Sequence, residues 1–185
     1  GVEKFRFQKL DEEINLITLA AKYADLTLEY LRDNGQDLIN NKLNERELVK
    51  ICTEYSKNQM LKDLPNDFDE TPCNVVATIH SGPRGALPHG KSLSRIPKSN
   101  ETLICGVGAC VGGMYAESGV TFILGEPNKD QENIMIAMQK ANDEVVRNLK
   151  EGQMCEEINK IAFKIYHEYG LSEFIRHRIG HGMGF

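Results

Sequence analysis

The chain has 185 residues, of which 41% are hydrophobic and 26% are charged, a composition typical of a soluble globular protein, and the length suffices for one substantial core or two small halves. The formal net charge of −5 excludes the positive field that gathers nucleic acid or an anionic membrane surface. The sequence also has no run of about 18 apolar residues and no charged-then-apolar leader. We therefore expect a cytoplasmic protein that binds neither nucleic acid nor a membrane.

Two amphipathic helices are predicted in the first third of the chain. From Asp11 onward, apolar residues recur at steps of three and four, which predicts a helix that ends at Gly35. Asn44 followed by Glu47 resembles a capping box. We therefore expect a second helix from Asn44 to about Met60.

A strand and a glycine-rich hairpin are predicted in the middle of the chain. The segment "NVVATIH" (74–80) has the β-branched content of a strand and runs into a loop over 81–100. Two further strands follow within 103–124, and they meet at Gly112 and Gly113, which favour a tight turn.

The C-terminal third is predicted to be mainly helical. Apolar periodicity predicts helices over 128–150 and 154–169, and "RIGHGMGF" (178–185) resembles a last strand. The strands cluster between helices without strand–helix alternation, which predicts an α+β fold with a curved antiparallel sheet covered by helices on one side. Because the last strand has no partner left in the sequence, we expect the domain to be incomplete at its C-terminus.

The hairpin carries glycine where strands usually carry side chains. With a turn at 112–113, Gly106 faces Gly119 and Gly108 faces Glu117, all on one face of the sheet. Such a hollow has room for a ligand, a metal or a side chain from elsewhere in the fold. The alternative interpretation is that Glu117 is a solvent-facing strand acid and the glycines are bulges.

Two further segments carry candidate functional groups. The loop "SGPRGALPHG" presents Arg84 and His89, and "RIGHGMGF" presents His181 between two glycines. A lone histidine is more often an ordinary core or surface residue, whereas glycine flanks and a nearby carboxylate favour a site. We expect the Glu117 carboxylate to lie within about one side-chain length of the His181 ring, which would make one shared site.

Taken together, "SGPRGALPHG", the hairpin followed by "GEP", and "GHGMGF" resemble the pita-bread superfamily of methionine aminopeptidases, Xaa-Pro peptidases (prolidases) and creatinases. The resemblance implies that 1–185 is a creatinase/aminopeptidase-like catalytic domain without its second pseudo-symmetric half, and that the protein is a homodimer. In this family, two hairpin aspartates, a histidine and two later glutamates hold two metals. The first aspartate falls on Gly106, the second on Glu117 and the histidine on His181.

The sequence departs from the family pattern at the metal site. Gly106 has no ligating atom, and two neighbouring divalent cations need several carboxylates around them. At least one metal position should therefore be lost, and we favour a protein without a metal cofactor.

The resemblance then implies a hydrolase of a C–N bond in a small amide, amidine or peptide, metal-independent or with a single metal. As in the creatinases, His89 would be the acid/base. Glu117 and His181 would hold the substrate or orient water, and Arg84 would contact a substrate carboxylate. The remaining predicted substrate-binding positions are Gly106 and Gly119.

Two alternatives remain open. The first is an Xaa-Pro metallopeptidase that keeps one divalent metal (Mn, Co, Zn or Fe) on Glu117 and His181. The second is a catalytically inactive peptide-binding module on the same fold.

Overall fold

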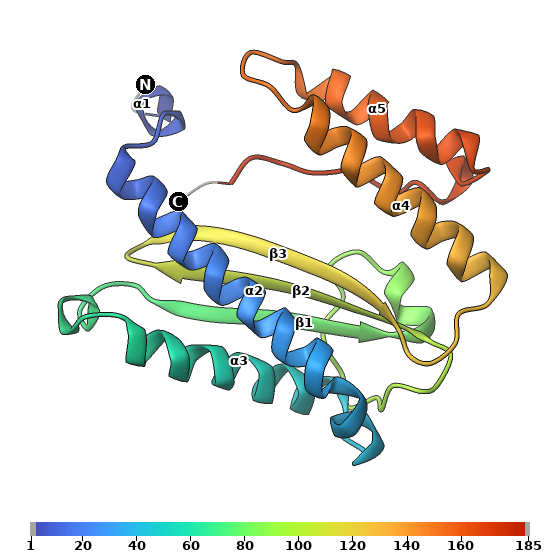
Figure 1. The fold of residues 1–185 in the computed structure, drawn as a ribbon, viewed down its shortest axis with the longest axis horizontal. Helices are drawn as coiled ribbons and strands as arrows, with labels where there is room; N and C mark the ends of the chain where they lie inside the picture. Colours follow the sequence, from blue (N-terminus) through green and yellow to red (C-terminus); the bar gives the residue numbers. More distant parts are fainter. Residues whose placement is uncertain (1–2, 184–185) are drawn as a thin grey trace. The chain divides into compact units, whose positions relative to one another are not determined.

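The computed structural model describes residues 3–183, and three helices, three strands and two more helices follow one another along the chain (Figure 1). Their bounds are α1 Glu3–Phe7, α2 Asp11–Asn40, α3 Glu45–Asp63, β1 Asn74–Ser81, β2 Thr102–Val111, β3 Met114–Ile123, α4 Lys129–Asn148 and α5 Cys155–Glu168. They belong to two compact units: the first runs to Gly125 and includes Met183, and the second is Glu126–Gly182. Among the described helices, none is long and apolar enough to cross a membrane.

The predicted end of the first long helix at Gly35 is wrong, because α2 continues to Asn40. Gly35 lies on the buried face of α2, and Ile39, about one turn later, is buried as well. An interior glycine costs a helix about 1 kcal/mol relative to alanine. The apolar surface that α2 buries beyond Gly35 outweighs that cost.

Helix α3 begins where the capping pattern predicted. The Asn44 side-chain oxygen accepts the N–H groups of Arg46 and Glu47, at 3.0 and 3.2 Å. In return, the Glu47 carboxylate accepts the N–H of Asn44 at 2.8 Å. These bonds satisfy backbone donors that the first turn of a helix leaves without partners.

The three strands form one antiparallel sheet in the order β1–β2–β3. Both turn glycines, Gly112 and Gly113, have positive φ angles of 57° and 82°, which a tight two-residue hairpin turn requires. The register pairs Gly106 with Gly119 and Gly108 with Glu117, as the sequence predicted. Since side chains alternate along a strand, these two pairs lie on the same face.

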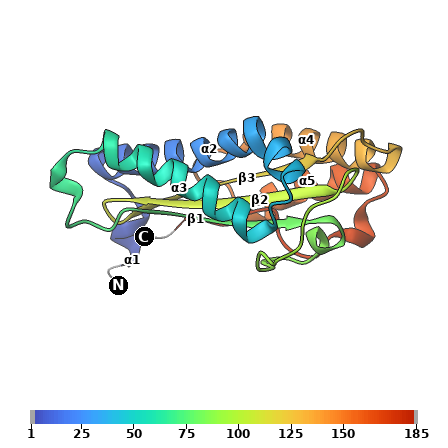
Figure 2. The same ribbon diagram turned by 90° about the horizontal axis from the view of Figure 1, so that it is seen from below.

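The two faces of the sheet differ in what covers them. α2 and α3 pack on one face (Figure 2), where Cys105, Val107 and Ala109 are almost fully buried. The other face carries the glycine pairs, together with Val76 and Tyr115, which are 57% and 43% exposed. We call this second face the open face. The prediction of an α+β fold, with an antiparallel sheet that has helices on one side, is confirmed for the first unit.

The second unit is built on the helix pair α4 and α5. A small cluster of Ala141, Ala162 and Ile165 lies between the two helices. Asn128 caps α4 by accepting the N–H of Gln131 at 2.9 Å. Both helices agree with the prediction apart from a few residues at their ends.

The predicted last strand is not formed in the described part of the chain, because residues 175–183 have no regular secondary structure. The N–H of Ile179 donates instead to the side-chain oxygen of Asn159, at 3.1 Å. A strand needs a neighbouring strand to satisfy its backbone groups, and 175–183 pairs with none of the described strands. Gly184 and Phe185 lie outside the described residues.

Candidate active site

The glycines of the hairpin leave open space on the open face. A Cβ placed on Gly106 would meet only Thr78 Oγ1, at 3.6 Å, and one on Gly108 would meet only Val76 Cγ2, also at 3.6 Å. A Cβ on Gly119 would meet a backbone carbonyl oxygen at 3.5 Å. These are ordinary van der Waals distances, so side chains up to the size of alanine fit without displacing a described neighbour. The glycines therefore form a floor on which another group has room to lie.

The loop after β1 packs on this same face. His80 lies on the open face at the end of β1, and its ring Nε2 contacts the carbonyl oxygen of Gly90. A Cβ on Gly90 would lie 3.3 Å from that ring, and a Cβ on Gly85 would lie 3.0 Å from Ile104 Cδ1. Both glycines thus permit a close approach of the loop backbone to the sheet. The segment that contains His89 is held over the end of the open face.

His89 has a left-handed backbone conformation, with φ 53°. Such a conformation costs an L-residue about 1–2 kcal/mol. The side chain is exposed, and its ring makes no hydrogen bond within the part of the chain that the structure describes. Non-glycine residues held in strained conformations cluster at functional sites. This geometry is compatible with the predicted acid/base role, which stays a prediction.

A carboxylate that we did not predict anchors this loop. Glu45, at the start of α3, is completely buried. It accepts hydrogen bonds from Ser81 N at 2.9 Å, Ser81 Oγ at 2.7 Å, Arg84 Nη1 at 2.5 Å and Leu93 N at 2.8 Å. Four donors, one of them charged, offset the cost of taking a carboxylate out of water.

These donors also set the ionisation of Glu45. Burial alone would raise the pKa of its carboxyl, but the hydrogen bonds from Leu93 and Ser81 and the charge of Arg84 together hold that pKa below its usual value. A carboxyl whose pKa is lowered by folding stabilises the fold above its unfolded pKa, and that stabilisation is lost as the pH falls. Glu45 is therefore an ionised anchor at neutral pH.

A second ion pair continues the network. Arg95 Nη1 donates to Ser81 Oγ at 2.6 Å, and its two terminal nitrogens donate to the Glu101 carboxylate at 2.8 and 2.5 Å. The hydrogen bonds from Arg95 lower the pKa of Glu101. The network has no net charge, because it contains two carboxylates and two guanidinium groups, those of Glu45, Glu101, Arg84 and Arg95.

The predicted site residues fall into two groups. Glu117 is exposed on the open face of β3, in the same unit as the glycine floor and the loop. The Arg84 side chain is 21% exposed, and its Nη2 donates to the carbonyl oxygen of Lys91 at 2.5 Å, in addition to its bond with Glu45. His181 belongs to the second unit, where its Nδ1 lies 3.0 Å from the carbonyl oxygen of Gly182. The contact of Arg84 with substrate and the closeness of Glu117 to His181 both stay predictions.

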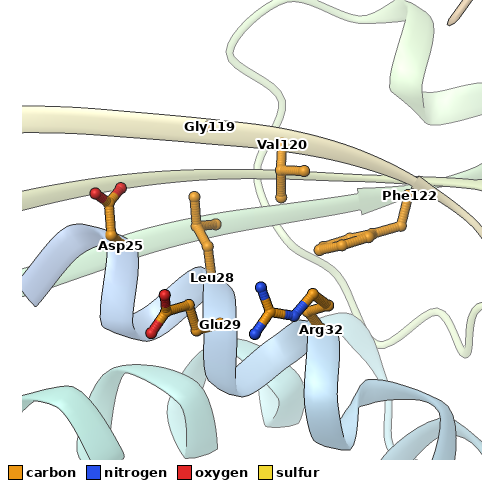
Figure 3. Close-up of a pocket in the computed structure, with 7 residues that line it drawn as sticks. All are labelled: Asp25, Leu28, Glu29, Arg32, Gly119, Val120 and Phe122. Atoms are coloured by element: carbon orange, nitrogen blue, oxygen red, sulfur yellow. The ribbon is translucent and has the colours of Figure 1, made fainter.

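A second hollow, of about 310 Å³, lies between α2 and the edge of β3 (Figure 3). Its apolar lining comes from Leu28, Val120 and Phe122, and Asp25, Glu29 and Arg32 of α2 add charge. Ser118 Oγ donates to Asp25 Oδ1 at 2.6 Å, which ties β3 to α2 beside the hollow. The hollow lies on the helix-covered face of the sheet, to which Val120 and Phe122 point, and Gly119 is the one predicted site residue that also lines it.

The donor set of the hairpin does not fit a dinuclear metal centre. Glu117 is the one acidic residue between Thr102 and Ile123, and Gly106 and Gly119 face each other without a ligating atom. Across the described residues, no three His, Cys, Asp or Glu side chains gather in a group that could hold a metal ion. These residues alone therefore do not form the centre that two bridged cations need.

The comparisons with known proteins identify the class. The model of metallopeptidase family M24 matches residues 15–185, so the chain belongs to this family. It is 28% identical over 184 residues to an uncharacterised peptidase of Staphylococcus epidermidis, covering 100% of this chain and 49% of that protein. It is 28% identical over 183 residues to the Xaa-Pro dipeptidase of Pyrococcus furiosus, covering 99% of this chain and 49% of that protein. The chain thus spans about half the length of the curated relatives it matches.

Solved structures agree on the fold. The prolidase from Pyrococcus furiosus matches with a TM-score of 0.82 at 24% identity, over 99% of this chain and 50% of that one. The N-terminal domain of the FACT complex subunit SPT16 from chickpea matches with a TM-score of 0.77 at 19% identity, over 90% of this chain and 40% of that one. The resemblance to the pita-bread superfamily is confirmed by the family match and by the fold.

Proposed function

We propose that the protein is an M24-family hydrolase that cleaves a C–N bond in a small amide, amidine or peptide without a dinuclear metal centre on its hairpin. The observation that carries the proposal is the register, which sets Gly106 against Gly119 and leaves Glu117 as the one acid of the hairpin. The membership in family M24 supports the hydrolase class. The chain would be the first part of one catalytic domain, acting in the cytoplasm as a homodimer.

In this proposal, different residues carry out different steps in the hydrolysis of a C–N bond. The hydroxyl of water goes to the carbon, and the nitrogen leaves with the proton. As the acid/base, His89 would take the proton from the water and give it to the departing nitrogen. Glu117 and His181 would hold the substrate or orient the water, with the glycine floor as the space in which the substrate lies.

The experiment combines metal analysis with hydrolysis assays on the protein purified without added metal or chelator. We expect less than about one metal equivalent per chain. Hydrolysis of at least one substrate among Xaa-Pro dipeptides, small amides and amidines should survive a chelator and fall about 10²- to 10⁴-fold in His89→Ala, the usual contribution of a general acid or base. His167→Ala, at an exposed histidine of α5, is the matched control and should leave the rate unchanged.

Each alternative has its own outcome in this experiment. Two equivalents of Mn, Co, Zn or Fe per chain would overturn the proposal and favour an Xaa-Pro metallopeptidase; the Pyrococcus furiosus relative is named an Xaa-Pro dipeptidase. Peptide binding without turnover of any substrate would favour the inactive binding module. The monomer or dimer mass measured by light scattering tests the homodimer.

A gain-of-ligand variant tests the metal argument from the other direction. Gly106→Asp would place a carboxylate at the position where the family carries its first hairpin aspartate, and the structure leaves space for its Cβ. We expect this variant to retain more Mn or Co than the parent protein after dialysis. Equal metal content in the two proteins would mean that Gly106 does not decide metal binding.

A further inference from the structure

The loop over 82–95 is fixed to the first turn of α3 at several points. The backbone N–H of Glu45 donates to Arg95 O at 2.9 Å, and that of Arg46 donates to Leu93 O at 3.2 Å. Arg46 Nε also donates to Ser92 O at 3.1 Å. The returning end of the loop therefore occupies backbone donors that a helix start leaves open, while the Glu45 side chain reaches beneath it.

Arg84 closes the loop on itself. Its Nη1 binds the buried Glu45 carboxylate and its Nη2 binds the carbonyl oxygen of Lys91, both at 2.5 Å. The residues between Arg84 and Lys91 include His89, so one guanidinium links the two ends of the segment that carries it. A planar guanidinium bound to two acceptors restricts the conformation of the loop more than a single hydrogen bond does.

From this we propose that Glu45 and Arg84 are positioning residues: together they hold the 85–90 segment, and with it the His89 imidazole, over the end of the open face. Arg84 then acts on the substrate through His89 and not by binding a substrate carboxylate. The inference rests on the proposed function only for its kinetic readout. The contacts that carry it are those of Glu45, Ser81 and Leu93 in the first unit.

The alternative role of Arg84 has a different chemistry. A guanidinium that binds a substrate carboxylate must turn donors toward solvent. Arg84 instead directs one N–H of each terminal nitrogen to a protein oxygen, which fixes the plane of the group, and its side chain is only 21% exposed. Freeing those donors would leave the Glu45 carboxylate buried with one partner fewer, which is costly. The observed bonds therefore favour positioning.

The first test is amide hydrogen exchange on the parent protein and on Glu45→Gln. A glutamine turns one acceptor oxygen into a donor, so at least one of the Ser81 and Leu93 N–H groups loses its acceptor. We expect exchange at one or both of these amides to accelerate about 10- to 100-fold, while exchange in the β2–β3 ladder is unchanged. Glu54→Gln is the matched control: Glu54 lies on the same helix in an exposed ion pair with Lys50 at 3.9 Å, and exchange should change less than about twofold.

The second test uses Arg84→Lys, which keeps the charge next to Glu45 but cannot bridge to Lys91, and so remains informative if Glu45→Gln fails to fold. Rates are measured on a peptide substrate with a free C-terminal carboxylate and on its C-terminal amide. Positioning predicts that kcat falls about 10- to 100-fold for both substrates with their ratio and KM unchanged. A rise in KM confined to the free acid would overturn the inference and restore the substrate contact.

The two tests separate this inference from the proposed function. If the parent protein hydrolyses no substrate, the proposed function fails, and exchange at Ser81 and Leu93 still decides whether Glu45 holds the loop. Unchanged exchange in Glu45→Gln, with the variant folded, would overturn the positioning role whatever the activity.

Discussion

Filling the glycine floor should stabilise the protein while abolishing its activity. Gly106→Ala adds a Cβ that meets only Thr78 Oγ1 at 3.6 Å, and Gly106 does not have a positive φ angle. Since an interior strand glycine costs about 0.5–1 kcal/mol relative to alanine, the free energy of unfolding should rise by about that amount. In Gly106→Val the free energy of unfolding should rise by about 1 kcal/mol in total, because β-branched residues are favoured in strands. Both variants should lose hydrolysis, the valine variant more completely.

The assay is urea unfolding at constant m-value, with substrate turnover measured on the same samples. Gly152→Ala is the control: a Cβ there meets no described atom within 4 Å, but the φ of 80° strains any L-residue, so the free energy of unfolding should fall by about 1 kcal/mol. A stability loss above about 1 kcal/mol in Gly106→Ala would mean that another part of the protein occupies the space. Full activity in Gly106→Val would refute the use of the floor as a substrate site.

Three further changes test separate features of the first unit and of α5. Gly82→Ala should lower the free energy of unfolding by about 1–3 kcal/mol, because φ at this residue is 57° and the new Cβ would lie 2.7 Å from the Glu101 carboxyl carbon. Urea unfolding that shows no loss of stability would contradict this geometry. Burial raises the pKa of the Cys105 thiol to about 12, so a thiol reagent at pH 8 should modify exposed Cys155 at once and Cys105 only on unfolding; labelling of Cys105 in the folded protein would contradict its burial. Gly35→Ala should gain less than the full helix propensity of about 1 kcal/mol, because its Cβ would lie 3.2 Å from a leucine in the preceding turn; a full gain in urea unfolding would show that this leucine yields freely.

The sequence predicted the register of the hairpin correctly because that information is local. A turn at Gly112 and Gly113 and the alternation of side chains along a strand are enough to set Gly108 against Glu117. The capping pair at Asn44 likewise lies within one helical turn. The helix end at Gly35 was wrong for the opposite reason: tertiary burial of the last turns of α2 overrides the weak local preference of a glycine.

Glu45 was missed because its contacts are long-range in sequence. Its partners lie 36, 39 and 48 positions away, at Ser81, Arg84 and Leu93. In the sequence, an acid at the first position of a helix resembles an ordinary exposed group that favours the helix dipole. One local signal was available: "SGPRGALPHG" carries an arginine with no acid of its own, so a partner from elsewhere in the fold could have been sought.

The glycine floor and the anchored loop point to one use of the open face. Gly106, Gly108 and Gly119 each cost the sheet about 0.5–1 kcal/mol, and His89 adds about 1–2 kcal/mol through its backbone conformation. Against a total stability of about 5–15 kcal/mol, a cost of this size is large. Packing does not require this loss of stability, because alanine fits at the three glycine positions and glycine at position 89 would remove the backbone strain. The open face thus combines unfilled space above the glycines with a strained residue in a loop that a buried carboxylate fixes. A site that binds a ligand needs both features.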